Sequence, residues 1–220
     1  MRAWLRDHSL GVVTGLLFLA FLAGMAIAGL SNYNQDQQDH GQPAVSFVTY
    51  LVSANFGEAV FENWESEFLQ MGMLIVLTIF LFHRGSAESK PIDEEAEQDS
   101  DPRASAQNKT APWPVRRGGW VLVLYENSLV ILFAVLFIAS FMLHAITGAA
   151  EFSEEQINHG GSPVGAWDYL ATSRFWFESF QNWQSEFLAV AVMVVATVFL
   201  RQRGSPQSKP VAAAHSETSA

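Results

Sequence analysis

Hydrophobic residues are gathered into four stretches that are nearly free of charge: Leu10–Leu30, Phe68–Phe82, Trp120–Thr147 and Phe187–Leu200. The first and third are long enough to span a bilayer, since an α-helix needs about 20 apolar residues to cross roughly 30 Å of hydrocarbon. The second and fourth have 15 and 14 residues and reach that length only with the polar residues that precede them. The pattern therefore predicts an all-α membrane protein with four spans, near residues 10–30, 63–83, 120–147 and 182–201.

Between the two spans of each pair lies a segment that is too apolar for a simple loop. Residues 45–61 and 164–180 mix aromatic side chains with polar ones. We expect an interfacial helix, which places its rings among the lipid headgroups and its polar face in water. The alternative is a re-entrant hairpin, whose irregular backbone must be buried against protein. The aromatic residues expected at the interface are Tyr50, Tyr169, Trp64 and Trp183.

The two pairs of spans are copies of one another. Residues 8–91 superpose on residues 127–210 without a gap, at an offset of 119 residues, and 32 of the 84 positions are identical. Each copy holds an even number of spans, so both copies enter the membrane from the same side. The sequence thus predicts two parallel tandem repeats, related by an axis along the membrane normal, that form a four-helix bundle.

The positions of the charges predict the orientation of the spans. The net charge is −10, but the loops 31–62 and 148–181 together contain only Arg174 of the twelve Lys and Arg residues. Because positive flanks stay in the cytoplasm, we expect both termini and the central linker to be cytoplasmic. The basic start and Ala26-Ile27-Ala28 also resemble a cleaved secretory signal. We favour a retained first helix, because its apolar stretch is longer than a signal core and has an internal copy.

The domain boundaries follow from the repeat and from local composition. Repeat 1 covers residues 8–91 and repeat 2 covers residues 119–210. Residues 92–118 begin with an acidic run and continue with Ser, Ala, Gln and Pro, which bury too little apolar surface to fold alone. We expect a disordered cytoplasmic linker there and a disordered tail at residues 211–220.

The most specific shared feature is an Asn-Trp-x-Ser-Glu-Phe block at the start of each short span. Its Asn and Glu lie four residues apart on one helix face, at a depth where a bare carboxylate is costly. One hypothesis is that Glu67 and Glu186 meet near the axis and bind a proton or cation. The sequence favours the alternative, in which they cap the short helices and meet the headgroups. The polar residues of this candidate ion or structural site are Asn63, Asn182, Ser66, Ser185, Glu67 and Glu186.

Three histidines invite a metal or haem hypothesis. His144 lies near the end of the third span, but its counterpart is Met25, and a haem between helices needs ligands at membrane depth. His40 and His159 recur in the two copies, each followed by Gly and close to several carboxylates. This arrangement favours a turn over a metal site, so we expect no metal and no cofactor.

The repeated block resembles that of a bacterial family of small multi-pass membrane proteins known only as a domain of unknown function. The resemblance covers residues 8–91 and 127–210. It implies a location in the bacterial inner membrane, and it supplies no activity, ligand or catalytic residue.

Few function classes fit this sequence. Cysteine is absent, which excludes disulfide and thiolate chemistry, and no phosphate-binding glycine loop, catalytic triad or basic nucleic-acid patch occurs. We expect no enzyme and no nucleic-acid binding; the expected partners are the lipid bilayer and a membrane protein or a second copy of the chain. The sequence favours a non-enzymatic scaffold or accessory protein. The alternative is a small channel or transporter for protons or cations that uses the paired glutamates.

Overall fold

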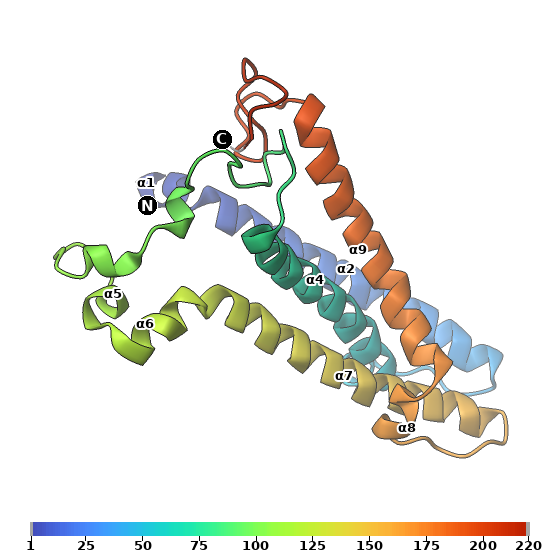
Figure 1. Ribbon diagram of the computed structural model, residues 1–220. Helices are drawn as coiled ribbons and strands as arrows, with labels where there is room; N and C mark the ends of the chain where they lie inside the picture. Colours follow the sequence, from blue (N-terminus) through green and yellow to red (C-terminus); the bar gives the residue numbers. More distant parts are fainter. Residues whose placement is uncertain (1, 219–220) are drawn as a thin grey trace. The chain divides into compact units, whose positions relative to one another are not determined.

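The structure is a computed structural model that describes residues 2–218. These residues form helices joined by turns and loops, with no strand among them (Figure 1). In chain order the elements are α1 (Arg2–Asp7), α2 (Ser9–Asp39), α3 (Phe47–Leu51), α4 (Ala54–Phe80), the 3-10 turns η1 (Glu97–Asp99) and η2 (Pro102–Ser105), α5 (Trp113–Arg117), α6 (Gly119–Glu126), α7 (Ser128–Asn158), α8 (Ala166–Leu170) and α9 (Ser173–Phe199).

Three helices in the described part of the chain, α2, α7 and α9, are long and apolar enough to cross a membrane. The described part of the chain is therefore all-helical, and its three apolar helices are compatible with a membrane protein. Helix α4 is as long as α9, with 27 residues each, and its apolar run starts at the equivalent position, but before that run α4 carries Glu62 and Glu65 where α9 has Gln181 and Gln184. The expected span at residues 63–83 thus belongs to a helix that begins nine residues earlier, at Ala54.

The apolar stretch 120–147, expected as one span, is divided between two helices, α6 and α7. At their junction the side chains of Asn127 and Ser128 each donate a hydrogen bond, at 2.8 Å, to a backbone carbonyl of the preceding turn. Ser9 makes the same kind of bond between α1 and α2. Asparagine and serine favour such local bonds over a continuous helix, so the stretch is divided, and α7 is the part of it that is long enough to cross a membrane.

The segments 45–61 and 164–180 each begin with a short helix, α3 or α8, of five residues. Two residues separate the end of each of these helices from the start of the next one. The Ser53 hydroxyl then accepts from the backbone N–H of Phe56 at 3.2 Å, and the Thr172 hydroxyl donates to the preceding α8. The rest of each segment consists of the first two turns of α4 or α9.

The chain divides into two compact units. Unit 1 contains Met1–Phe61 and Leu143–Thr172, and unit 2 contains Glu62–Met142 and Ser173–Ala220. Unit 1 therefore holds α1 to α3, α8, the start of α4 and the second half of α7. Unit 2 holds most of α4, the first half of α7, and α9 with the linker and the tail.

In unit 1, side chains at equivalent positions tie the loop after each long helix back to that helix. Asn34 of α2 donates to the backbone oxygen of Val45 at 3.1 Å and accepts from its N–H at 2.7 Å. Ser153 of α7 makes the same two contacts with Val164, at 3.1 and 2.8 Å. One side chain satisfies both backbone groups of the returning loop, which fixes where α3 and α8 begin.

In unit 2, the Arg-Gly-Ser segments after α4 and α9 fold into the same loop. Gly85 and Gly204 have φ values of 84° and 85°, a conformation that residues with side chains rarely adopt. Ser89 and Ser208 then accept from the backbone N–H that precedes the arginine, at 3.0 and 2.9 Å. These bonds turn the chain back at the end of each helix.

Candidate functional site

The shared Asn-Trp-x-Ser-Glu-Phe block lies inside α4 and α9, not at their starts. The Ser66 hydroxyl donates to the backbone oxygen of Asn63, and the Ser185 hydroxyl to that of Asn182, both at 2.8 Å. Ser66 is buried, whereas Asn63 and Ser185 are exposed. Both serines therefore bond within their own helix, which leaves the Asn, Trp and Glu side chains of the block for other contacts.

Glu67 and Glu186 both belong to unit 2. Glu67 is exposed and Glu186 is half-buried, and the two carboxylates are close enough to interact electrostatically. The Gln70 side chain donates to the backbone oxygen of Glu186 at 3.1 Å and so ties α4 to α9 here. The two glutamates are thus within electrostatic reach of each other, but they are not enclosed together.

The two tryptophans of the block have different neighbours. The ring of Trp64 packs edge-on against Phe68, with centroids 6.4 Å apart. Trp183 contacts Phe180 at 5.5 Å, and its indole N–H donates to Glu65 Oε1 at 3.0 Å. Glu65 has no exposed surface. One of the expected interfacial aromatic residues therefore holds a buried carboxylate that the sequence analysis did not single out.

Tyr50 and Tyr169 are buried in unit 1, each against a glycine of a long helix. A Cβ atom added to Gly29 would lie 2.1 Å from the Tyr50 hydroxyl oxygen, and one added to Gly148 would lie 2.6 Å from a ring carbon of Tyr169. Glycine is required because the ring sits directly on the backbone. Burial raises the pKa of the Tyr50 hydroxyl, and the charge of Glu151 adds to this.

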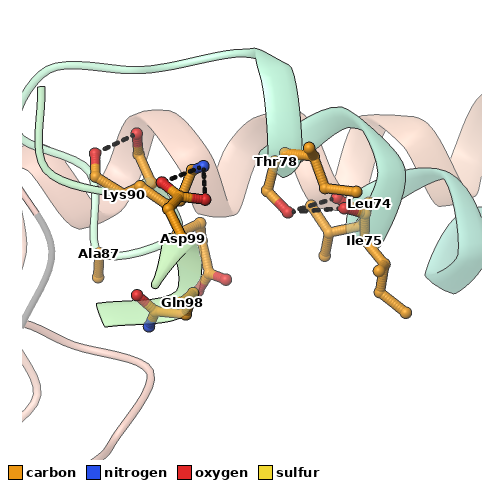
Figure 2. A pocket seen from close by; sticks show the side chains of 10 residues that line it. Leu74, Ile75, Thr78, Ala87, Lys90, Gln98 and Asp99 are labelled. Atoms are coloured by element: carbon orange, nitrogen blue, oxygen red, sulfur yellow. Dashed lines mark hydrogen bonds and ion pairs between the residues drawn. The ribbon is translucent and has the colours of Figure 1, made fainter. Parts of the chain in front are cut away.

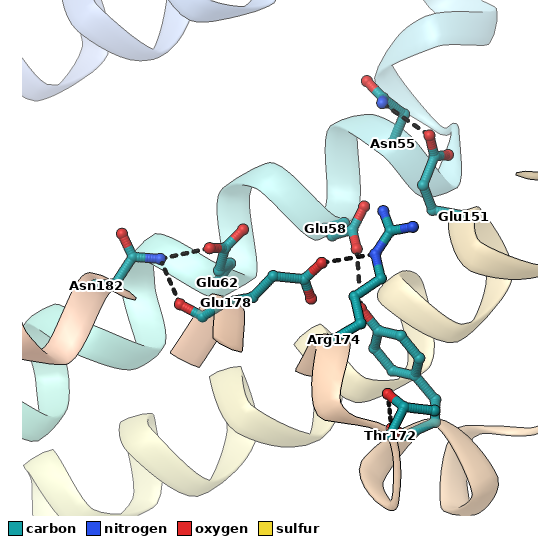
Figure 3. Close-up of polar contacts among 9 residues, drawn as sticks. Asn55, Glu58, Glu62, Glu151, Thr172, Arg174, Glu178 and Asn182 are labelled. Atoms are coloured by element: carbon teal, nitrogen blue, oxygen red, sulfur yellow. Dashed lines mark hydrogen bonds and ion pairs between the residues drawn. The ribbon is translucent and has the colours of Figure 1, made fainter. Parts of the chain in front are cut away.

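The Tyr169 hydroxyl reaches a buried carboxylate. It donates to Glu58 Oε1 at 3.3 Å (Figure 3), and Glu58 is only 8% exposed. His144 of α7 has no exposed surface, and one of its ring nitrogens lies within 4.8 Å of a Glu58 carboxylate oxygen. All three residues belong to unit 1. A carboxylate, an imidazole and a phenol thus meet away from solvent.

A second polar contact lies beside this group in unit 1. The Asn55 side chain, from the first turn of α4, donates to Glu151 Oε1 of α7 at 3.0 Å (Figure 3). A Cβ atom added to Gly57 would lie 2.7 Å from the Thr147 methyl carbon. The start of α4 is therefore held against α7 both by a hydrogen bond and by close packing.

Unit 2 contains further carboxylates with polar partners on α9. The Asn182 side chain donates to Glu62 of α4, and within α9 the Arg174 guanidinium pairs with Glu178 at 2.8 Å (Figure 3). Arg174 is the cation that the sequence places in an external loop. The ion pair offsets its charge with a carboxylate one turn away on the same helix.

Glu58, His144 and Tyr169 form the candidate functional site. Ionisable groups buried away from water are costly, and a cluster of them is a candidate for a functional site. Imidazole changes its charge near neutral pH, and a phenol both donates and accepts hydrogen bonds. The three side chains therefore have the chemistry needed to hold a proton and exchange it.

The sequence analysis missed the buried glutamates because it searched for residues that both copies share. Glu58, Glu62 and Glu65 have no acidic counterparts in the second copy. Their equivalents are Phe177, Gln181 and Gln184. The signal that could have found them is their spacing of four and three residues, which places all three on one face of a helix.

A pocket of about 490 Å³ lies beside the end of α4 in unit 2 (Figure 2). The Lys90 ammonium donates to both carboxylate oxygens of Asp99, at 2.8 Å each, and Leu74 and Ile75 line the apolar side. The two charged groups satisfy each other. This pocket is therefore a weaker candidate than the buried group of unit 1.

Comparison of the chain with curated proteins gives no match, and comparison with solved structures gives none either. One family matches, and it covers residues 1–220; it is described as a domain of unknown function, DUF6766. The match agrees with the expected membership of a family of unknown function. Because it spans the full length, the chain belongs to the DUF6766 family.

Proposed function

We propose that the chain is a bacterial inner-membrane protein with four spans, built from two parallel two-helix repeats and with both termini in the cytoplasm. Equal helix lengths support the repeat: α2 and α7 have 31 residues each, and α4 and α9 have 27. The starts of these pairs are offset by the same 119 residues as the sequence identities. The distribution of Lys and Arg supports the orientation, and α4 supplies the fourth span.

The function that the geometry supports best is the passage of protons, or of a small cation, across the membrane without chemical transformation. One observation carries this proposal: Glu58 is buried between a tyrosine hydroxyl at 3.3 Å and an imidazole within 4.8 Å. A glutamine would serve a purely structural role at lower cost, because it needs no compensation for a charge. A role in proton transfer explains why a carboxylate, and not an amide, occupies this position.

Each side chain has a distinct role in the transfer. Glu58 receives a proton on a carboxylate oxygen. The proton then moves to a ring nitrogen of His144, which becomes an imidazolium and leaves Glu58 as a carboxylate. The Tyr169 hydroxyl donates to that carboxylate, and so stabilises its charged form between two protonations.

Proton flux into liposomes tests the proposal. The purified chain is reconstituted with a pH-sensitive dye in the lumen, and a potassium diffusion potential set with valinomycin drives proton entry. We expect faster acidification than in protein-free liposomes. Glu58→Gln keeps the size and a hydrogen-bond acceptor but cannot titrate, so the rate should fall at least about tenfold, given the usual contribution of a positioned proton-transfer group.

Glu94→Gln is the matched control, since it makes the same change at an exposed position in the linker. Its flux should equal that of the wild type. The proposal is wrong if wild-type liposomes acidify no faster than empty ones, or if Glu58→Gln conducts as well as the wild type while its helix content is unchanged by circular dichroism.

The exposed aromatic surface favours a second candidate, a non-enzymatic scaffold. Trp167 of α8 is 79% exposed, and large exposed aromatic residues are common where membrane proteins meet partners. A stoichiometric partner that co-purifies with the wild type and is lost in Trp167→Ala, together with an absence of flux, would favour this role over transport.

A further inference from the structure

The C-terminal ends of α2 and α7 enclose a pocket of about 230 Å³ in unit 1. None of the described residues that line it is a Lys or Arg. The carboxylates in its wall are Asp36, Glu151, Glu154 and Glu155. The negative ends of two helix dipoles also point toward it. The pocket therefore has a strongly negative potential and attracts cations.

Two imidazoles, His40 and His159, line this pocket and meet edge to face. They lie 119 residues apart in the chain, but their ring centroids are 6.4 Å apart and their planes make an angle of 71°. A bound zinc ion lies about 2.0–2.1 Å from each ligating nitrogen. The rings are near enough for side-chain rotation to direct one nitrogen of each toward a shared ion.

A hydrogen bond to the backbone fixes the tautomer of each ring. His40 Nδ1 lies 2.9 Å from the backbone oxygen of Asp36, and His159 Nδ1 lies 2.8 Å from that of Glu155. A carbonyl can only accept, so in each neutral ring Nδ1 carries the proton and Nε2 keeps its lone pair. Metal-binding histidines are typically held in this way, with one ring N–H on a carbonyl and the other nitrogen on the metal.

We propose that His40 and His159 bind one divalent transition-metal ion, with Zn²⁺ as the representative, and thereby join the ends of α2 and α7. The turn expected at these positions is present as well, because Gly41 and Gly160 have φ values of 73° and 79°. The turn and the metal site are compatible, since each glycine ends the helix and leaves the preceding imidazole directed by its backbone bond.

His8 provides a natural control for the backbone bond alone. Its Nδ1 lies 2.8 Å from the backbone oxygen of Trp4, but its ring stacks on the Trp4 indole at 4.6 Å instead of facing an imidazole. If the backbone bond served only to end a helix, replacing His8 and replacing either pocket histidine would have the same effect on Zn²⁺ binding.

Titration calorimetry of Zn²⁺ into the full chain in detergent, purified on a tag without histidine, tests the site. We expect one ion per chain, with the affinity lowered at least about tenfold by His40→Ala and by His159→Ala, since each removes a ligand. His8→Ala should bind as the wild type does. Co²⁺ in place of Zn²⁺ should give visible absorption bands that both pocket variants lose.

Absence of Zn²⁺ binding by the wild type would overturn the proposal. So would wild-type affinity in either pocket variant, or an equal loss in His8→Ala. Circular dichroism of each variant establishes that it is folded. Binding is measured without any ion gradient, so this result is independent of whether the chain passes protons.

Discussion

Helices α4 and α9 have the same length and share a central motif, but in unit 2 they take opposite parts in the hydrogen bonds that join a side chain of one to a side chain of the other. Helix α4 supplies the acceptors Glu62 and Glu65, and α9 supplies the donors Asn182 and Trp183. The residues equivalent to the two glutamates are amides in α9. Two nearly identical helices can therefore carry unequal chemistry when a few positions on the facing side differ.

Unit 1 shows the opposite behaviour, because equivalent residues there make equivalent contacts. Tyr50 lies on Gly29 as Tyr169 lies on Gly148, and both tyrosines are buried. Contacts of this kind use identical residues in the two copies. We infer that the shared contacts determine the backbone, whereas the residues that differ, Glu58 and His144 among them, determine the chemistry of the site.

The largest expected effect tests the shared contacts. Gly29→Val and Gly148→Val each place a side chain where a tyrosine lies, and each should lower the free energy of unfolding by about 2–3 kcal/mol through overpacking. The two losses should agree within about 1 kcal/mol, because the contacts are equivalent. Thermal unfolding in detergent, followed by intrinsic fluorescence, measures both.

Gly24→Val is the control for this pair. No heavy atom lies within 4 Å of a Cβ atom added to Gly24, so the change should cost much less than at the two tyrosine sites. Equal losses in the free energy of unfolding at all three glycines would show that helix propensity, and not the contact with the tyrosine ring, determines the loss.

The next effect tests the unequal contacts. Glu65→Ala removes the acceptor of the Trp183 indole and empties a fully buried position, so we expect a loss of about 1–3 kcal/mol in the free energy of unfolding. Gln184→Ala makes the equivalent change at an exposed position of α9 and should stay within about 0.5 kcal/mol of the wild type. Similar losses in the two variants, measured by the same unfolding assay, would contradict the asymmetry.

A smaller effect is expected where the returning loops are tied to α2 and α7. Asn34→Ala and Ser153→Ala each remove two hydrogen bonds to one loop residue, and each should cost about 1 kcal/mol. Amide exchange at Val45 and Val164 locates the effect. The exchange of Val45 should accelerate only in the first variant, and that of Val164 only in the second.

Much of the helical pattern could be predicted from the sequence, because apolar runs and helix period report directly on membrane burial. The starts of α4 and α9 could not. Both begin on the polar side of their apolar runs, at Ala54 and Ser173, where hydropathy gives no signal and the helix is held by contacts with distant residues such as Glu151.

The repeat indicates equivalent helices, but it does not indicate which carboxylates are buried. Residues shared by the copies, such as Glu67 and Glu186, attracted attention because identity is visible in one sequence. Burial is not visible there. Glu58 and Glu65 became notable only when the structure showed them enclosed, since a glutamate at the same helical spacing is usually on a solvated face.

The smallest effect concerns pH and the loops that follow α4 and α9. Arg84 Nη1 donates to Asp93 Oδ2 at 3.0 Å, and this hydrogen bond lowers the pKa of Asp93, with the charge of Arg84 as the second cause. The second copy has Arg203, but Ala212 stands at the position of Asp93. The ion pair at this position therefore occurs in the first loop, where it depends on pH.

The sign of this dependence follows from the direction of the shift. A carboxyl whose pKa is lower in the folded state contributes stability above its ordinary pKa, and that contribution is lost as the pH falls through the lowered value. The protection of the Gly85 amide, measured against the intrinsic exchange rate at the same pH, should therefore fall on acidification, whereas that of Gly204 should change less. In Asp93→Asn the two glycines should respond alike, because an amide cannot titrate. If the amide protection of Gly85 still changes with pH in Asp93→Asn, another titratable group causes the effect.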